Sequence, residues 1–295
     1  MKHAYLIIAH NEYPVLRALL SMLDDERNDI YLHIDQRAAE LYEKIYPLQM
    51  QRAGLHILSA RNKVYWGDLS QVETEYLLLE TASAKESYSY YHLLSGTDLP
   101  IQTQDYIHSF FQINAGKEFV EYWFGNRHQK DLKRKISRYY FFTKHMKRNN
   151  SKWHVITAPC RNLALIAQKM VHFHRKQEVE FRKGSQWFSI THNFCLYLLE
   201  KKSFVLQRFR YTLCPDEIFV QTLLWNSPFK KNIYHIEENH IGSMRLIDWN
   251  RGNPYTWKMQ DYTELTNSDK LFARKFSSQE EELIKLIETT YWQVT

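Results

Sequence analysis

The chain has 295 residues, enough for one large α/β domain or two small ones with a sizeable hydrophobic core. Its three cysteines form no C-x-x-C pair, which argues against a secreted disulfide framework and a zinc ribbon and favours a reducing compartment. The eight glycines are too widely spaced for a G-x-G-x-x-G motif or a P-loop. No run of about 18 apolar residues predicts a transmembrane helix, and the N-terminus has no signal-peptide cleavage pattern.

Positive charge is concentrated in one segment. The formal net charge is +6, yet residues 127–152 hold ten Lys and Arg against a single acid, Asp131. Several aromatic residues lie within this segment. The combination fits an anionic membrane surface or a nucleic acid, and it also fits a solvated insertion whose rings face the core.

The N-terminal half alternates short apolar runs with amphipathic segments, which predicts successive βα units. Residues 4–9 are apolar throughout, as expected of a strand buried on both faces of a parallel sheet. Asn11 is expected to cap the next helix, and Ser70 with Glu73 forms a capping-box pattern. Further strands are predicted at 30–35, 55–58, 88–95 and 118–123, and helices at 41–51, 70–84 and 104–112.

The second half continues with a strand at 184–190 and helices at 159–174, 193–201, 215–225 and 278–290. Ser278 with Glu281 forms a second capping-box pattern, which starts the last helix. Residues 244–276 show no clear periodicity and are expected to be weakly structured. The alternation as a whole predicts an α/β fold with a largely parallel sheet in one compact domain.

Metal and nucleophile motifs are missing from the sequence. There is no D-x-D, H-x-x-x-H, HExxH or EF-hand pattern, so a metal-free mechanism is favoured. There is also no G-x-S-x-G or S-x-x-K motif. The three cysteines lie in apolar settings, which are typical of inert core thiols.

Two groups of residues remain as candidates for chemistry. Glu217 is expected in the first turn of a helix, where the helix dipole would favour an ionised base, although Pro-Asp-Glu is also simply a good helix start. A second group of cations lies in the weakly structured stretch and fits either an anion-binding loop or ordinary surface charge. This group consists of Arg245, Arg251, Arg274 and Lys275.

Seven short motifs occur in order along the chain. Residues 91–101, YHLLSGTDLPI, carry the pattern LLSG-x-D-[FL]-P-I. The others are YLIIAH at 5–10, LHID at 32–35, VYWG at 64–67 followed by Ser70, GSQW at 184–187, PDE at 215–217 and LFARKF at 271–276. Together they resemble the core-2/I-branching glycosyltransferases, which include mucin-type β-1,6-N-acetylglucosaminyltransferases and peptide O-xylosyltransferases. The resemblance covers about residues 4–276.

The resemblance implies a GT-A-like fold and an inverting, metal-independent transfer from a UDP-sugar to an acceptor hydroxyl. N-acetylglucosamine, xylose and glucuronate are all compatible donor sugars, and no cofactor or metal is expected. One domain would span 1–295. Residues 1–125 would form its nucleotide-sugar-binding half, 126–276 its acceptor-binding and catalytic half, and 277–295 a C-terminal helix.

Site residues follow from the resemblance position by position. Glu217 matches the catalytic base, and Arg245 with Lys275 matches the basic pair that binds the diphosphate in place of a metal. His10 and Asp35 fall on the strand ends that hold the uridine. The donor or acceptor sugar is expected at Asp98, Ser185 and Trp187.

Animal relatives carry an N-terminal membrane helix and disulfides that this sequence does not reproduce. We therefore expect a bacterial, cytoplasmic enzyme of surface polysaccharide synthesis, with peripheral association at the inner membrane face. Its acceptor would be a glycan or a lipid-linked glycan, and residues 127–152 would meet anionic lipid. No nucleic-acid partner is expected. The alternative function is a non-catalytic protein that binds carbohydrate or nucleic acid and would not need Glu217.

Overall fold

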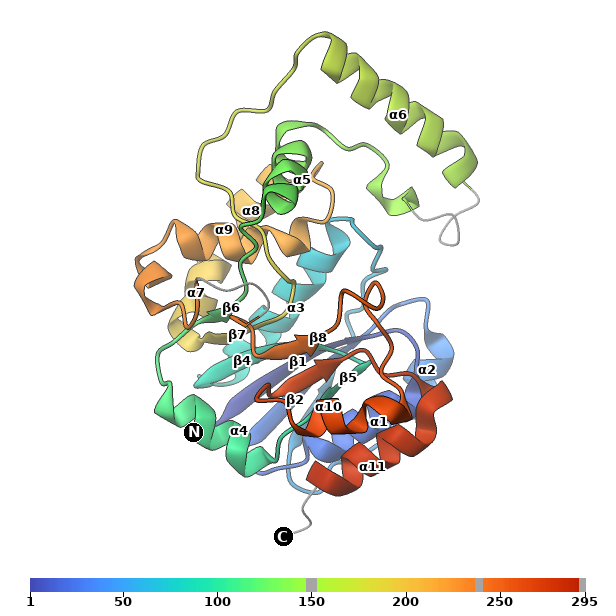
Figure 1. Cartoon of the computed structure of the whole chain (residues 1–295), viewed down its shortest axis with the longest axis vertical. Coiled ribbons are helices and arrows are strands. Elements are labelled where there is room, and N and C mark those ends of the chain that lie inside the picture. Colours follow the sequence, from blue (N-terminus) through green and yellow to red (C-terminus); the bar gives the residue numbers. More distant parts are fainter. Residues whose placement is uncertain (147–152, 237–240, 292–295) are drawn as a thin grey trace.

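The computed structural model describes residues 1–146, 153–236 and 241–291. A central six-stranded sheet has the order β3-β2-β1-β4-β7-β6 (Figure 1). The first four strands in this order are parallel, and β7 is antiparallel to both of its neighbours. The strands are β1 (His3–Ala9), β2 (Asn28–Ile34), β3 (Gly54–Ile57), β4 (Tyr90–Ser95), β6 (Phe119–Val120) and β7 (Phe188–Thr191). The predicted α/β class with a mostly parallel sheet is confirmed.

The central strand β1 is buried on both faces, as its apolar run predicts. Ala4 and Leu6 belong to one hydrophobic cluster, whereas Tyr5 and Ile7 belong to the other, and all four are fully buried. Successive side chains of a strand point to opposite faces. The sheet therefore separates two cores and needs helices on both sides.

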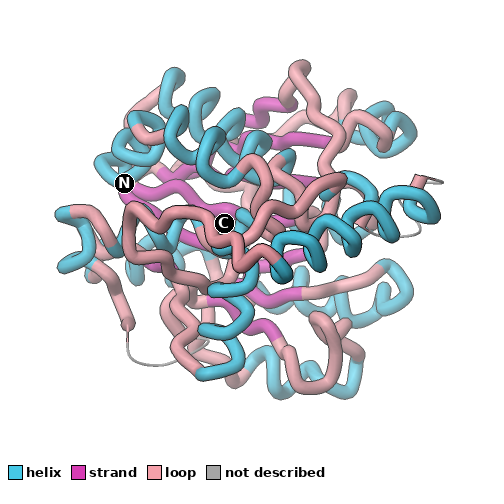
Figure 2. Tube along the Cα trace, turned by 90° about the horizontal axis from the view of Figure 1, so that it is seen from above, coloured by secondary structure: helices cyan, strands magenta, loops and turns pink. Residues whose placement is uncertain are grey.

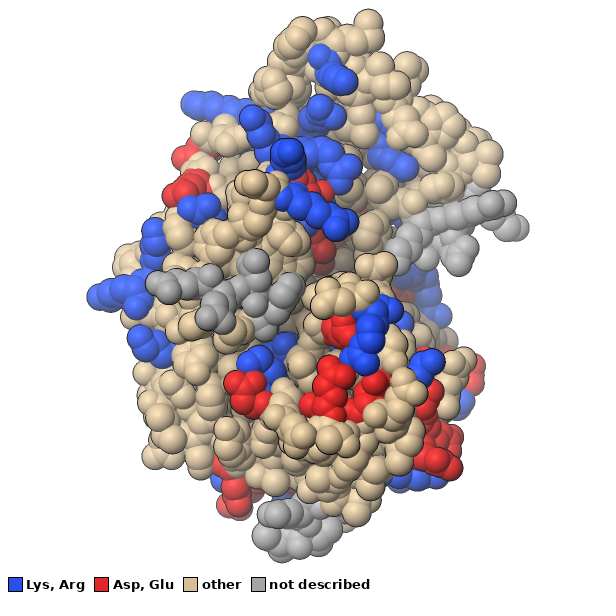
Figure 3. Space-filling view, viewed as in Figure 1, with Lys and Arg blue, Asp and Glu red and all other residues tan. Residues whose placement is uncertain are grey.

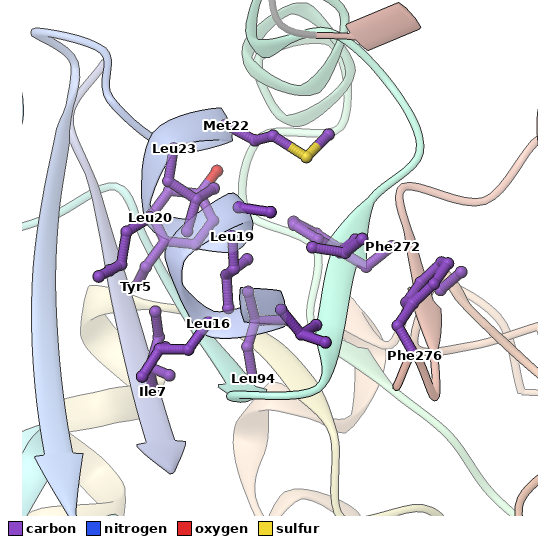
Figure 4. Close-up of a cluster of buried hydrophobic side chains, with 14 of the residues drawn as sticks. Tyr5, Ile7, Leu16, Leu19, Leu20, Met22, Leu23, Leu94, Phe272 and Phe276 are labelled. Carbon is purple, nitrogen blue, oxygen red and sulfur yellow. The ribbon is translucent and has the colours of Figure 1, made fainter. Parts of the chain in front are cut away.

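Helices cover both faces of the sheet, as the view from above shows (Figure 2). On one side, leucines of α1 pack against Tyr5 and Ile7 of β1 and against Leu94 of β4 (Figure 4). The helices of this side are α1 (Tyr13–Met22), α2 (Ala39–Ile45), α4 (Gln104–Ile113), α10 (Tyr262–Thr266) and α11 (Glu281–Tyr291). The other side is covered by α3 (Ser70–Lys85), α7 (His192–Glu200), α8 (Lys202–Phe209) and α9 (Phe219–Trp225).

A second sheet of three short strands packs against the hydrophobic cluster that contains Tyr5 and Ile7. It consists of β5 (Asp98–Pro100), β9 (Phe272–Arg274) and β8 (Arg245–Ile247), in that order. The expectation that residues 244–276 are weakly structured is therefore wrong at β8 and β9, and it is also wrong at α10. Strands of three residues are too short to show the period of two on which a sequence reading depends.

Three of the expected helix caps are also wrong. Glu12, not Asn11, precedes α1, with a left-handed backbone (φ 58°), and its carboxylate accepts a 2.6 Å hydrogen bond from the Ser278 amide. The Ser70 hydroxyl instead accepts a hydrogen bond from the Tyr65 amide. At the start of the last helical segment, Ser277 takes the capping role expected of Ser278. Side chains near helix starts, such as Glu12 and Ser70, thus bind backbone amides of other segments instead of capping their own helix.

Two helices, α5 (Asn126–Ser137) and α6 (His154–Met170), extend the molecule beyond the sheet (Figure 1). The α6 helix begins five residues before the predicted start and contains Pro159. Within the described part of the chain, no helix is both long and apolar enough to cross a bilayer. Short 3₁₀ turns occupy Thr143–His145, Pro215–Glu217, Pro228–Asn232, Met259–Asp261 and Ser278–Glu280.

Three buried histidines meet at the amino ends of β1 and β4. The rings of His3 and His108 stack 4.1 Å apart, and His3 Nδ1 lies 3.1 Å from His92 Nε2. Burial lowers the pKa of His108 to about 4, and it lowers the pKa values of His3 and His92 well below 6.5. His33, buried in β2, also has its pKa lowered to about 4 by burial. These four imidazoles are neutral in the fold at neutral pH.

Candidate active site

A pocket of roughly 580 Å³ opens where the parallel strands β1, β2 and β4 end. His10 follows β1, Asp35 follows β2 and Ser95 ends β4, and all three line the pocket. Ligands of open α/β sheets bind at the carboxyl ends of the strands. The position of the pocket agrees with this rule.

Asp35 is a fixed acid at the end of β2. It accepts two hydrogen bonds from the Arg37 guanidinium, at 2.9 and 2.8 Å, and one of 2.9 Å from the Val64 amide. Burial alone would raise the pKa of Asp35, but these hydrogen bonds hold it below its usual value. His10, the other residue expected near uridine, is solvent-exposed and lines the same pocket.

Glu217 lies in the pocket and is held by two lysines. Its Oε2 is 3.0 Å from Lys135 Nζ of α5 and 3.0 Å from Lys183 Nζ. Asp131 Oδ2 contacts the same two ammonium groups, at 3.1 and 2.5 Å. Burial would lower the pKa of Lys135, but the charges of Glu217 and Asp131 contribute to a net increase. The result is a four-residue charge network around a carboxylate whose side chain is 28% exposed.

This arrangement corrects two sequence expectations. Glu217 lies in the 3₁₀ turn Pro215–Glu217 rather than in the first turn of an α-helix, so lysines and not a helix dipole are its nearest positive charge. Lys135 belongs to the basic segment that was expected to be exposed, yet its side chain is only 6% exposed. The charge pattern alone could not separate this one lysine from its neighbours on α5.

Glycines in two motifs place neighbouring backbone against the Glu217 turn. A Cβ atom on Gly184 would lie 1.8 Å from the Glu121 carbonyl oxygen, so no side chain fits there. The Gly184 amide donates a 2.9 Å hydrogen bond to the carbonyl of Glu217. Gly67, with φ +73°, accepts a 3.0 Å hydrogen bond from the Cys214 amide. The GSQW and VYWG motifs therefore meet at the turn that carries Glu217.

Two more acids, Asp216 and Glu75, are buried near Glu217. Burial, followed by the nearby charge of Glu217, raises the pKa of Asp216 to about 7. Its Oδ1 has no hydrogen-bond partner among the described residues, and Asp216 lines the pocket. Glu75 of α3 is fully buried, which raises its pKa well above the usual value, and Gln186 donates to it at 3.0 Å. Asp216 belongs to the PDE motif, whereas nothing in the sequence of α3 marks Glu75 as inward-facing.

Arg274 and Lys275 bring positive charge to the pocket. Arg274 Nη1 donates to Asp98 Oδ1 at 2.6 Å, and the guanidinium lies 4.6 Å from the centre of the Trp187 ring. Lys275 lines the pocket and has no ion pair with any residue of the described ranges. An anion bound beside these two residues would thus meet one oriented guanidinium and one ammonium, while Arg37, which pairs with Asp35, also lines the pocket.

Arg245, expected to form the basic pair with Lys275, does not line the pocket. It is 4% exposed and donates to the carbonyls of Ser243 and Phe188 and to the Ser189 hydroxyl, at 2.6, 3.0 and 3.0 Å. Burial lowers its pKa to about 10. The sequence could not show that this side chain of β8 points toward β7 of the central sheet. Arg274 lines the pocket beside Lys275 in place of Arg245.

The three residues expected to touch a sugar occupy different places. Ser185 and Trp187 line the pocket, whereas Asp98 is buried beneath it and binds Arg274. Four of the eight tryptophans of the chain line the pocket, and the sequence motifs predict only Trp187 as a sugar contact. Flat aromatic faces suit the apolar faces of sugar rings. The four are Trp66, Trp123, Trp187 and Trp249.

No three His, Cys, Asp or Glu side chains of the described residues are grouped as a metal ion would require. Two of the three acids that line the pocket are instead engaged by cations. Asp35 pairs with Arg37, and Glu217 pairs with lysines. Metal independence stays a prediction that chelation can test.

Comparisons with known proteins agree with the motifs. The family model for the Core-2/I-Branching enzyme matches residues 3–270. Rat xylosyltransferase 2 is 24% identical over 303 residues, covering 93% of this chain and 32% of the relative. Drosophila melanogaster xylosyltransferase oxt is 22% identical over 280 residues, covering 88% of this chain and 30% of the relative. The chain therefore spans about a third of the length of these relatives.

Among solved structures, mouse xyloside xylosyltransferase 1 in its apo form aligns with 92% of this chain and 96% of its own. The TM-score is 0.41 and the sequence identity 8%. Staphylococcus aureus TarS aligns over 39% of this chain and 20% of its own, with a TM-score of 0.28 and 11% identity.

Proposed function

Since the chain belongs to the Core-2/I-Branching enzyme family of glycosyltransferases, we propose that it transfers a sugar from a UDP-sugar to a hydroxyl of a glycan acceptor, with inversion and without a metal ion. The observation that carries the proposal is the shared pocket of Glu217, Arg274 and Lys275. A carboxylate base and two cations are what a direct displacement of a diphosphate requires when no metal takes part.

In the proposed reaction, the acceptor oxygen attacks the anomeric carbon from the side opposite the diphosphate. The bond from that carbon to the diphosphate oxygen breaks, and the electron pair leaves with UDP. Glu217 takes the proton of the acceptor hydroxyl. Its two lysine contacts fix the carboxylate in one orientation, and a positioned base typically contributes about 10²–10⁴ in rate.

The departing diphosphate gains negative charge during the reaction. Arg274 is held in place by Asp98 and by the Trp187 face, so it needs no rearrangement to meet that charge. Lys275 supplies the second cation. We assign the uridine to the strand ends at His10 and Asp35, and the sugars to the surfaces of Ser185 and Trp187.

The donor sugar is a choice among xylose, N-acetylglucosamine and glucuronate. The names of the relatives, xylosyltransferases, make UDP-xylose the first donor to compare. Four tryptophans and few small residues line the pocket, so a pentose without an exocyclic C6 group needs the least room. We place the product in surface polysaccharide synthesis.

The experiment is a hydrolysis panel with UDP-xylose, UDP-N-acetylglucosamine and UDP-glucuronate, in the presence of EDTA, with released UDP as the readout. Slow release from one donor, unchanged by EDTA, supports the proposal and identifies that donor. Release that requires Mn²⁺ contradicts the role of Arg274 and Lys275. If no donor is hydrolysed and saturation-transfer NMR detects only sugar binding, the chain is a carbohydrate-binding protein instead.

A further inference from the structure

The outward face of α6 is apolar along its whole length. Val155, Leu163, Ile166 and Met170 are 72%, 69%, 55% and 74% exposed. At 3.6 residues per turn these positions, together with Ile156, Pro159 and Ala167, fall within an arc of roughly 120° that contains no charged residue. A surface helix of a globular protein normally shows the opposite arrangement, with its apolar stripe toward the core.

Polar contacts fix this orientation. The side chain of Gln168 exchanges two hydrogen bonds with the backbone of Tyr139, its Oε1 accepting at 2.8 Å and its Nε2 donating at 3.0 Å. His154 Nδ1 lies 2.8 Å from the carbonyl of His145. Arg161 and Thr157 are the buried residues of the helix. The helix therefore turns its polar side to the protein and its apolar side to solvent.

Exposed cations lie on α6 itself, on α5 and in the segments next to α6. Exposed lysines and arginines lie along α5 and the loop that follows it, and Figure 3 shows Lys and Arg gathered over α5 on the side of the body that faces α6. Only one acid, Asp131, occurs between residues 127 and 177, and it is engaged with Lys135 and Lys183. The exposed cations of the described residues here are Arg127, Lys130, Lys133, Arg134, Lys144, Lys169 and Lys176.

We propose that the outward face of α6 and the cations beside it dock this protein on an anionic lipid bilayer. An exposed apolar helix face flanked by Lys and Arg is the pattern of helices that lie in the membrane interface. Anionic headgroups complement the positive charge, and each cation near the surface strengthens binding. A second copy of the chain would bring the same positive charge against itself, so charge disfavours self-association through this face.

Docking through α6 would place the catalytic turn close to the lipid surface. Leu165 of α6 packs against a small cluster of Tyr140, Leu213 and Cys214. Cys214 immediately precedes the turn Pro215–Glu217. The inference that the acceptor is a glycan carried by a membrane lipid rests on the proposed function, whereas bilayer binding itself does not.

The test is flotation of the whole chain with vesicles of phosphatidylcholine alone or mixed with phosphatidylglycerol. We expect binding to the mixed vesicles that weakens as salt is added, because salt screens the charge. The triple variant Leu163→Gln, Ile166→Gln, Met170→Gln should lose about tenfold or more in vesicle affinity. Replacing Lys130 and Lys133 with Gln should weaken binding to the mixed vesicles only.

Matched controls separate the surface from general effects. Ile113, at the end of α4, is 83% exposed, and Ile113→Gln should leave vesicle binding unchanged. Thermal unfolding and UDP-sugar hydrolysis in solution should be the same in every variant. The hydrolysis assay tests the proposed function, and flotation tests bilayer binding independently of it. Equal binding to both vesicle types, or binding that survives the triple variant, overturns the proposal. A dimer in light scattering that the triple variant dissociates, with no vesicle binding, makes the face an interface between copies.

Discussion

The Lys135 ammonium lies 3.0 Å from the Glu217 carboxylate, although 82 residues separate the two in the sequence. Lys135 is on α5, and Glu217 is on the turn before α9. One helix therefore presents a buried lysine to Glu217 and exposed lysines to solvent. The basic segment is part of the site as well as part of the surface.

Replacing Glu217 with Gln should abolish sugar transfer, by about 10²–10⁴ in turnover, while UDP binding stays intact. The amide keeps the shape of the side chain but cannot take the acceptor proton. Turnover and calorimetric UDP affinity are the two measurements. The exposed acid Glu43 provides the matched control, since Glu43→Gln should change neither. Equal loss of turnover and UDP binding would show that Glu217 is not the base.

Lys275→Ala should affect UDP binding, whereas Arg245→Ala should affect the stability of the fold. Lys275→Ala is expected to weaken UDP binding with little change in unfolding, because its side chain lines the pocket without an ion pair among the described residues. Arg245→Ala should lower the free energy of unfolding by about 2–4 kcal/mol, since it leaves buried acceptors unpaired. Calorimetry and urea unfolding distinguish the two. A normal stability of Arg245→Ala with lost UDP affinity would restore Arg245 to the diphosphate site.

Asp98→Asn should weaken UDP binding indirectly. The Asp98 carboxylate is 2% exposed and holds Arg274 at 2.6 Å, so its loss leaves the guanidinium without a counter-ion. We expect weaker UDP binding, together with a loss of unfolding free energy of about 2–4 kcal/mol. The control is Asp105→Asn, because Asp105 is 74% exposed and does not line the pocket. Unchanged UDP affinity in Asp98→Asn would mean that Arg274 needs no support from Asp98.

Stability should fall as the pH drops from about 6.5 to 4. The pKa values of His33 and His108 are about 4 in the fold, so both stay neutral there, while an unfolded chain takes up protons below its ordinary pKa of 6.5. Each neutral histidine therefore contributes fully to the free energy of unfolding above pH 6.5, and this contribution is lost as the pH falls from 6.5 to 4. For His33 the loss amounts to about 3 kcal/mol.

The measurement is the free energy of unfolding in urea at several pH values. In His108→Gln the slope of stability against pH should be smaller by about 1.4 kcal/mol per pH unit within the window, because one proton fewer is taken up on unfolding. An identical slope in the variant and the parent would show that His108 titrates normally in the fold.

The sheet and the pocket could be predicted from the sequence to different degrees. The apolar run of β1 specifies a strand buried on both faces, and the ends of three such strands place His10, Asp35 and Ser95 together. Both features follow from local sequence patterns, since an apolar run predicts a buried strand and the ends of parallel strands meet at one edge of the sheet. The same patterns carry no information on which side of β8 Arg245 emerges.

The charge network around Glu217 could not be predicted. Lys135 and Lys133 are both lysines of one helix, and only packing makes the first buried and the second exposed. Lys183 precedes the GSQW motif, where spacing gives no reason to expect an ion pair with Glu217. A helix whose apolar face points outward, such as α6, likewise contradicts the assumption on which amphipathic patterns are read.

The pairing of β5 with β9, which places Asp98 opposite Arg274, also bears on the order in which the protein becomes functional during synthesis. All six strands of the central sheet and Glu217 precede residue 218 in the chain. Arg274 and Lys275 leave the ribosome later. A nascent chain can thus contain the proposed base before it contains these two cations. The segment with Arg274 and Lys275 must then pair with β5 before the pocket can bind a diphosphate through both cations.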